Sequence, residues 1–409
     1  MTKADKEGQR KAPILRFKGF TNDWEQRQLR EISSSTIGGG TPKSSNKKFW
    51  NGNIPWIQSS DLVNGDIWNI IIKKHITLDA VENSAAKIIS ANSIAVVTRV
   101  AVGKLVYMPL EYATSQDFIS FQNLSGDHSF FMYLVSKVMH KVKGSLQGTS
   151  IKGISKGELL KKKVIYTLNI KEQKKIGTLL KSLDTILTLY AKKSSCLDSC
   201  IAYFIRILYD DPQFFKQKNV QNSIIKSFKL DDILIKNNAK NKDLSILNVE
   251  SISNKKGFIS QKEQFDNYRV ASKDLSNYYV IRPKDFAYNP SRINVGSIAY
   301  KNPNEIKGIV SPLYVSFKCN NDIVLDKYLW YWFKSTNFEH QRVRLSEGGV
   351  RDTLSFNQLS KMKISIPSFE IQRQTINLLE ILIQYKEEVD LKLNNLKLIK
   401  NTLLQNMFL

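Results

Sequence analysis

The chain has 409 residues, of which 42% are hydrophobic and 10% aromatic, enough apolar material for about two or three packed domains. Lysine and arginine outnumber aspartate and glutamate by 61 to 37, and the formal net charge of +24 indicates a polyanionic partner, most simply a nucleic acid. This composition excludes a disordered chain, and no apolar run reaches the ~18 residues of a transmembrane helix.

The N-terminal residues predict a flexible start rather than a targeting signal. Residues 1–12 are mostly polar and charged and lack an apolar signal region, so we expect a disordered leader before Pro13. Three cysteines form an odd, sparse set, which is typical of a reducing cytoplasm. Cys196 and Cys200 are one helical turn apart, but no second pair completes a metal site, and we interpret them as small apolar helix residues.

The pattern of residues 13–169 predicts a first globular domain of mixed strands and helices. Its loop at 37–48 contains Gly38-Gly-Gly40, but Thr41 and Pro42 follow instead of a helix, so we expect a flexible loop rather than a phosphate cradle. Later segments predict paired strands at 93–98 and 103–107, a short strand at 118–121 and an amphipathic helix at 130–139.

Two long helices are predicted, at 170–209 and 367–409, with a second domain at 210–366 between them. In the first helix, apolar residues alternate at spacings of four and three from Ile176 to Leu208, with only Ser194 polar. The same alternation in the second helix gives a seam of Leu378, Leu382, Tyr385, Val389, Lys392, Leu396, Ile399 and Leu403.

Each helix alone would expose an apolar stripe, so each needs a partner. The order domain, helix, domain, helix makes an antiparallel pair the simplest solution, whereas the unbroken heptads disfavour a core helix pair inside one large domain. We therefore predict an α+β protein with two similar globular domains, separated by two long antiparallel coiled-coil helices with a pseudo-two-fold internal repeat.

The two halves of the chain are similar in sequence. A shift of 200 residues superimposes 148–180 on 348–380 and matches a glycine, a serine, two leucines, two lysines and an isoleucine. At a slightly different offset, Arg99-Val-Ala-Val-Gly103 matches Arg292-Ile-Asn-Val-Gly296. A period this long indicates a duplicated domain with its helix rather than a solenoid, and so two similar binding events.

Motifs of enzyme chemistry are missing from the sequence. It contains no phosphate-loop motif and no Pro-Asp dipeptide of the common nuclease signature, and its four histidines lack metal-ligand spacing. The segment Tyr288-Asn-Pro-Ser-Arg292 approaches but does not match the Asn-Pro-Pro-Tyr motif with which adenine methyltransferases hold a flipped base. We therefore expect a binding protein rather than a nuclease or methyltransferase in its own right.

Several segments together closely resemble the DNA-specificity subunit of type I restriction-modification enzymes, over nearly the whole chain after Pro13. Besides the duplication, they are Gly39-Gly-Thr-Pro-Lys43, Ile54-Pro-Trp-Ile-Gln-Ser-Ser-Asp-Leu62, Arg99-Val-Ala-Val-Gly-Lys104, Gly148-Thr-Ser-Ile151, Gly348-Gly-Val-Arg351 and Thr402-Leu-Leu-Gln-Asn-Met-Phe408. One departure is that the first helix ends in Tyr203-Phe-Ile-Arg-Ile-Leu-Tyr209, so the two copies have diverged.

The resemblance implies a non-catalytic, cytoplasmic subunit with two target-recognition domains, each reading half of a bipartite double-stranded DNA target. It implies helices that set the spacing of the half-sites, two methyltransferase subunits that bring S-adenosylmethionine for adenine methylation, and restriction subunits that bring ATP with magnesium for cleavage. No cofactor is expected in this chain. The alternative is a stand-alone DNA-binding regulator with two lobes, which would bind DNA tightly without methyltransferase subunits.

Basic residues in the two domains are the candidate DNA contacts, because arginine makes bidentate contacts to guanine and phosphate, and lysine binds mainly phosphate. For each lysine the alternative is a solvated surface charge, and for the matched arginines a shared structural role. The candidates are Lys43, Lys47, Lys48, Arg99 and Lys104 in the first domain, with Arg292 and Arg351 in the second.

Overall fold

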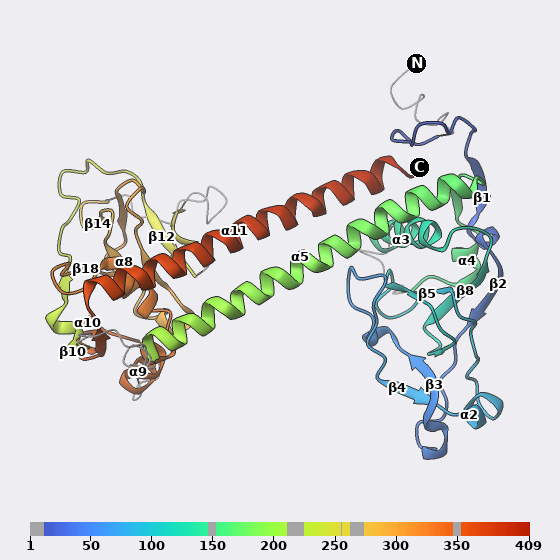
Figure 1. Cartoon of the computed structure of the whole chain (residues 1–409), viewed down its shortest axis with the longest axis horizontal. Helices are drawn as coiled ribbons and strands as arrows, with labels where there is room; N and C mark the ends of the chain where they lie inside the picture. The colour runs from blue at the N-terminus through green and yellow to red at the C-terminus, as the bar shows by residue number, and fades with distance from the viewer. Residues whose placement is uncertain (1–11, 146–152, 211–224, 255, 262–273, 347–352) are drawn as a thin grey trace. The chain divides into compact units, whose positions relative to one another are not determined.

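The computed structural model describes residues 12–145, 153–210, 225–254, 256–261, 274–346 and 353–409 (Figure 1). It divides into two compact units of mixed helix and sheet, one formed by residues 1–191 with 391–409 and the other by residues 192–390. The expected leader, 1–12, lies outside the described residues except for its last position. Each long helix contributes to both units, because the division falls within the helices.

Within its described residues, the first unit is built on an antiparallel sheet of four strands in the order β2-β8-β5-β6. A second sheet has the order β4-β3-β7, and β1 pairs with β9. The elements are β1 (Glu25–Gln28), β2 (Ser33–Gly38), β3 (Trp50–Ile57), β4 (Lys74–Ile76), α2 (Leu78–Glu82), β5 (Ser93–Val97), β6 (Leu105–Met108), β7 (Ala113–Thr114), β8 (Phe118–Leu124), α3 (His128–Ser145), α4 (Lys156–Leu160), β9 (Lys163–Tyr166) and α5 (Ile170–Asp210).

The second unit has a matching sheet of four described strands in the order β11-β18-β15-β16. Around it, β10 pairs with β19, β12 with β13 and β14 with β17. The elements are β10 (Lys226–Lys229), β11 (Leu234–Lys236), β12 (Glu250–Ser253), β13 (Gly257–Ser260), β14 (Tyr279–Ile281), β15 (Phe286–Tyr288), β16 (Ile298–Tyr300), β17 (Gly308–Val310), β18 (Val315–Cys319), α8 (Asp326–Trp332), α9 (Thr336–Ser346), α10 (Phe356–Ser360), β19 (Lys363–Ile366) and α11 (Phe369–Asn406).

The internal repeat predicted from the sequence is present in the topology of the two units. Their main sheets share one strand order, and β1–β9 has the same antiparallel register as β10–β19. Ser155 and Ser355 each cap the short helix that follows, since each hydroxyl accepts a hydrogen bond at 3.2 Å from the backbone amide three residues on. The units differ most in their smaller sheets. The first unit has one sheet of β4, β3 and β7, whereas the second has the pairs β12–β13 and β14–β17.

Aromatic residues pack against one another in the core of each unit. In the first, Phe130 of α3 packs against Trp24 and against Phe408 near the end of α11, with ring centroids 6.0 and 5.2 Å apart. In the second, Phe286 and Phe317 stack at 5.2 Å between β15 and β18. The end of α11 is therefore part of the core of the first unit.

The long helices pair antiparallel within each unit. In the second unit, Ser194 donates to Asp390 at 2.6 Å while Lys386 lies 3.3 Å from Asp198, so one helix advances as the other runs back. In the first unit, Lys400 forms an ion pair with Asp184. The predicted seam of α5 is confirmed, because every seam position from Ile176 to Leu208 is buried or half-buried.

The predicted seam of α11 is wrong at every second position. Its members Leu378, Tyr385, Lys392 and Ile399 are exposed, and the covered positions are Leu379, Lys386, Leu393 and Lys400. The physical reason is that Lys386 and Lys400 belong to the seam and pair with aspartates there, so an apolar pattern selects their neighbours Tyr385 and Ile399. The alternation of four and three then carries the same shift to the other two positions. The shared positions Leu382, Val389, Leu396 and Leu403 were correctly placed.

Cys196 and Cys200 lie in α5, Cys196 exposed and Cys200 half-buried, and burial raises the pKa of the Cys319 thiol to about 12. Among the described helices, none combines the length and apolar content needed to cross a bilayer.

Candidate nucleic-acid interface

The turn between β5 and β6 presents an arginine at the end of the main sheet of the first unit. Ile94–Val97 are fully buried, and Arg99 and Val100, which follow Thr98, are exposed, Val100 to 67%. Val100 and Ala101 have φ of 20° and 72°, values that residues with a β-carbon adopt only at a cost of about 1–3 kcal/mol each. The buried sheet thus holds a strained turn with its arginine in solvent.

The turn between β15 and β16 repeats this arrangement in the second unit. Arg292 is exposed and precedes the short 3₁₀ helix Ile293–Val295, in which Val295 is 56% exposed. The turn is closed by backbone bonds of Arg292, from its amide to Asn289 at 3.0 Å and to its carbonyl from Ser297 at 3.1 Å. Both arginine candidates therefore occupy equivalent places in the two sheets.

A returning segment reaches each turn in the same manner. The Ile154 amide donates to the Thr98 carbonyl at 2.9 Å, and the Leu354 amide donates to the Pro290 carbonyl at 3.1 Å. Tyr288 also donates from its hydroxyl to the Leu354 carbonyl at 3.0 Å. Arg351, the remaining candidate of the second domain, lies outside the described residues.

The glycine loop after β2, expected from the sequence to be flexible, is closely packed at Gly39 and Gly40. A Cβ on Gly39 would meet Thr114, and one on Gly40 would meet the Ala85 backbone, so both glycines allow close approach of the chain. The indole of Trp56 donates to the Gly40 carbonyl at 3.2 Å. This loop therefore has a fixed place against the small sheet.

The three lysine candidates of this loop are exposed next to that fixed backbone. The Lys43 carbonyl accepts a hydrogen bond from the Trp50 indole at 3.4 Å, and Lys47 and Lys48 begin the 3₁₀ helix η2 (Lys47–Phe49), which Asn46 caps. Their ammonium groups extend from an ordered loop, an arrangement suited to phosphate contact.

Lys104 differs from the other candidates because its ammonium is used inside the protein. It donates to the Leu62 carbonyl at 2.8 Å and approaches the Ser59 carbonyl at 3.4 Å, so it fastens the segment after β3 to the turn before β6. Its first role is to shape the surface beside Arg99.

Two basic residues that the sequence analysis did not select rest on aromatic rings, the exposed Lys74 and the half-buried Lys240. Lys74 of β4 lies 5.6 Å from the Trp50 ring and 5.5 Å from the Trp56 ring, and Lys240 lies 4.4 Å from the Tyr279 ring. The alternation of lysine with aromatic residues in neighbouring strands was the available signal, but the partners are distant in sequence.

Comparison with known proteins gives one family. Residues 21–198 match the family model described as the type I restriction modification DNA specificity domain. The chain is similar to a type I restriction enzyme specificity subunit of Methanocaldococcus jannaschii, at 27% identity over 199 residues, which are 48% of this chain and 46% of that protein. It is also similar to an Escherichia coli one, at 31% over 185 residues, 42% of this chain and 43% of that protein.

These alignments span less than half the length of the curated relatives, whereas structural similarity spans the whole chain. The crystal structure of a type I restriction-modification S subunit from M. genitalium has a TM-score of 0.63 at 16% identity and covers 97% of this chain and 99% of its own. A chain from a study of type I complex assembly and conformational transition gives 0.56 at 13%, covering 96% and 98%. Residues 21–198 are therefore similar to the type I restriction modification DNA specificity domain, and the chain as a whole shares its fold with a type I S subunit.

Proposed function

We propose that this chain is the non-catalytic subunit through which a type I restriction-modification complex recognises DNA, each unit reading one half of a bipartite target. The observation that carries the proposal is the pair of exposed arginine turns, at Arg99 and Arg292, at equivalent places in two sheets of one topology. Two similar sites on one chain match two half-sites, and the net charge of +24 favours the phosphate backbone.

The long helices, in this proposal, set the spacing of the half-sites and dock two methyltransferase subunits. Their outer faces expose apolar side chains, namely Leu189, Ile381, Leu391 and Leu398 at 59%, 56%, 62% and 66%. Exposed apolar side chains on one helix pair are typical of a surface that binds another protein. S-adenosylmethionine belongs to those partners, and ATP with magnesium to restriction subunits, in the cytoplasm.

Mapping of methylated adenines tests the proposal directly. Cells that express this chain with its methyltransferase subunits are expected to carry methyladenine in one bipartite motif, and cells with the methyltransferase subunits alone are expected to lack it. Single-molecule sequencing gives the readout. Equal methylation without this chain, or methylation by this chain alone, would contradict the assignment.

Exchange of residues 1–169 with those of another type I specificity subunit is expected to change one half-site and leave the other. The junction precedes Ile170, the first residue of α5, so the helix stays intact. A companion chimera that also takes residues 391–409 keeps the packing of Phe408 on Trp24 within one parent, at 6.3 Å. Alteration of both half-sites in the two chimeras would show that the units do not read DNA separately.

Replacement of either turn arginine, Arg99→Ala or Arg292→Ala, is expected to weaken specific DNA binding by about 1–3 kcal/mol. Both side chains are exposed, so the fold does not depend on them. Arg27→Ala is the matched control, because Arg27 of β1 pairs with Glu25 and with Glu31, which follows β1. Fluorescence anisotropy of the assembled methyltransferase measures the affinity, and unchanged binding in a folded variant removes that arginine from the interface.

A further inference from the structure

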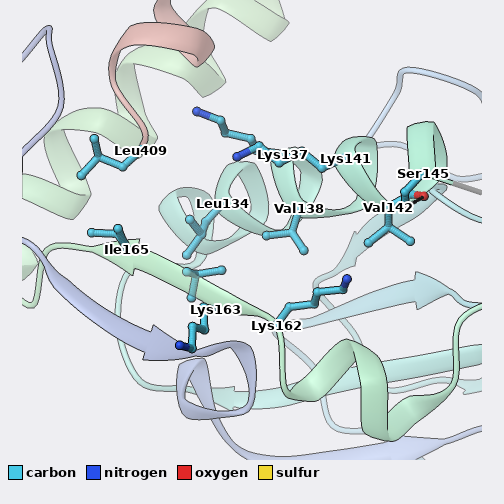
Figure 2. A pocket seen from close by; sticks show the side chains of 11 residues that line it. Leu134, Lys137, Val138, Lys141, Val142, Ser145, Lys162, Lys163, Ile165 and Leu409 are labelled. Carbon is cyan, nitrogen blue, oxygen red and sulfur yellow. Dashed lines mark hydrogen bonds between the residues drawn. The ribbon is translucent and has the colours of Figure 1, made fainter. Parts of the chain in front are cut away.

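A groove of about 400 Å³ lies between α3 and β9 in the first unit. Figure 2 shows Leu134, Val138 and Val142 projecting from α3 toward the strand, with Ile165 of β9 across from them. Four lysines also line the groove, Lys137 and Lys141 from α3 with Lys162 and Lys163 beside or within β9. The groove thus combines an aliphatic surface with ammonium groups.

The strand β9 has an edge without a partner strand. It pairs with β1 on one side, where the Leu29 amide bonds to the Lys162 carbonyl at 2.8 Å. In an antiparallel ladder the hydrogen-bonded pairs alternate, so the amides and carbonyls of Lys163 and Ile165 point away from β1. Within the described residues, no hydrogen bond joins these groups to a partner. The groove therefore borders a bare strand edge.

The second unit fills the equivalent edge with its own side chain. There the Gln341 amide of α9 donates to the Lys363 carbonyl at 2.8 Å and accepts from the Lys363 amide at 2.7 Å. The repeat offset of 200 found for residues 148–180 aligns Lys163 with Lys363, and the same offset extended back into α3 aligns Lys141 with Gln341. A lysine ammonium cannot both donate and accept, so the first unit cannot make this clamp.

The side chains that line the groove carry only positive charge. No carboxylate side chain is among its lining residues in the described part of the chain. Lys137 is half-buried, donates to the Phe408 carbonyl at 2.8 Å and lies close to Lys141, and burial together with the repulsion from Lys141 lowers its pKa to about 8. An anionic occupant would relieve that repulsion.

We propose that this groove binds an extended acidic segment of a partner protein, which adds to the free edge of β9 and places aliphatic side chains against α3. The strand edge supplies backbone hydrogen bonds, the aliphatic wall accepts alternate side chains, and the lysines bind carboxylates. A nucleic-acid phosphate would use neither the aliphatic wall nor the unpaired strand backbone, whereas an extended peptide would use both. These two features therefore favour a peptide. The inference concerns a surface separate from the arginine turns.

A hexapeptide of alternating glutamate and leucine, labelled with a fluorophore, serves as the probe for the full-length chain. We expect saturable binding, together with slower hydrogen exchange at the Lys163 and Ile165 amides in the complex. Lys141→Gln recreates the residue that occupies the edge in the second unit and is expected to weaken binding about tenfold, a change of about 1.4 kcal/mol. Lys161→Gln removes the same charge outside the groove, and binding should stay unchanged.

Two further probes decide between occupants. A peptide N-methylated on alternate backbone amides keeps its side chains but cannot pair with a strand, so its binding should be lost. A duplex oligonucleotide should leave the Lys163 and Ile165 amides unprotected. Absent peptide binding, equal binding of the N-methylated peptide, or protection of these amides by duplex DNA would each overturn the proposal.

Discussion

Lys301→Met is expected to lower the free energy of unfolding of the second unit by about 3–5 kcal/mol, because it leaves a buried carboxylate unpaired. The Lys301 and Glu250 side chains are 1% and 8% exposed, and the Lys301 ammonium lies 2.6 Å from both carboxylate oxygens. The pair joins β12 to the residue after β16, so its loss frees the β12–β13 hairpin from the main sheet. Denaturant unfolding followed by fluorescence measures the change.

Two comparisons separate the lost charge from the lost volume. The double variant Lys301→Met with Glu250→Leu is expected to recover most of the loss, because neither charge then remains buried. Lys318→Met, at an exposed position of β18, should change stability by no more than about 0.5 kcal/mol. An equal deficit in the double variant would refute this account.

The pairing of Lys301 with Glu250 also shows where sequence reasoning stops. Fifty-one positions separate the two residues, and nothing local distinguishes this lysine from the many exposed ones. The strands around the arginine turns were predictable, because Ile94–Val97 form an apolar run followed directly by polar residues. The sequence pattern does not show where the side chain of each lysine points. Lys104 was therefore predicted to contact DNA, whereas in the structure its ammonium donates to the Leu62 carbonyl.

The seam of α11 illustrates the same limit in a regular element. When only apolar residues are chosen, corresponding seam positions of α5 and α11 differ by 202 in residue number. The covered positions of the two helices do not follow this offset. The covered positions give 199, since Leu180 corresponds to Leu379 and Leu208 to Met407. The buried glutamines agree: Gln173 accepts from the Asp127 amide at 2.9 Å and Gln372 from the Leu325 amide at 2.8 Å. Buried polar residues therefore also mark the alignment of the two helices, and a search for apolar residues alone overlooks them.

Insertion of four residues into α5 after Ser195, the second large effect, is expected to lengthen the tolerated DNA spacer by one or two base pairs. Four residues add about 6 Å to a helix, and each base pair advances the duplex about 3.4 Å. Four residues also turn the helix about 40° beyond one full turn, close to the ~35° of one base pair, so spacing and angular phase change together. The prediction rests on the proposed role of the helices as a spacer.

The partner helix must grow with α5 for the pairing to survive. Ser195 lies between Ser194, which bonds Asp390, and Asp198, which faces Lys386, so an insertion in α5 alone separates these contacts. A matched insertion after Glu388 of α11 lies between Lys386 and Asp390 and keeps both. Seven residues would preserve a 3.5-residue seam better than four, at the cost of a larger phase change.

The methylated motif of an active insertion variant is the decisive measurement, because lost activity also follows from a misfolded helix pair. We expect both half-sites unchanged and the spacer longer in the doubly inserted protein, with the singly inserted protein less stable. A control with four substitutions and no insertion at the same positions should keep the original spacer. If an active double insertion still methylates the original motif, these helices do not set the distance between the half-sites, since the added length would have moved one unit relative to the other.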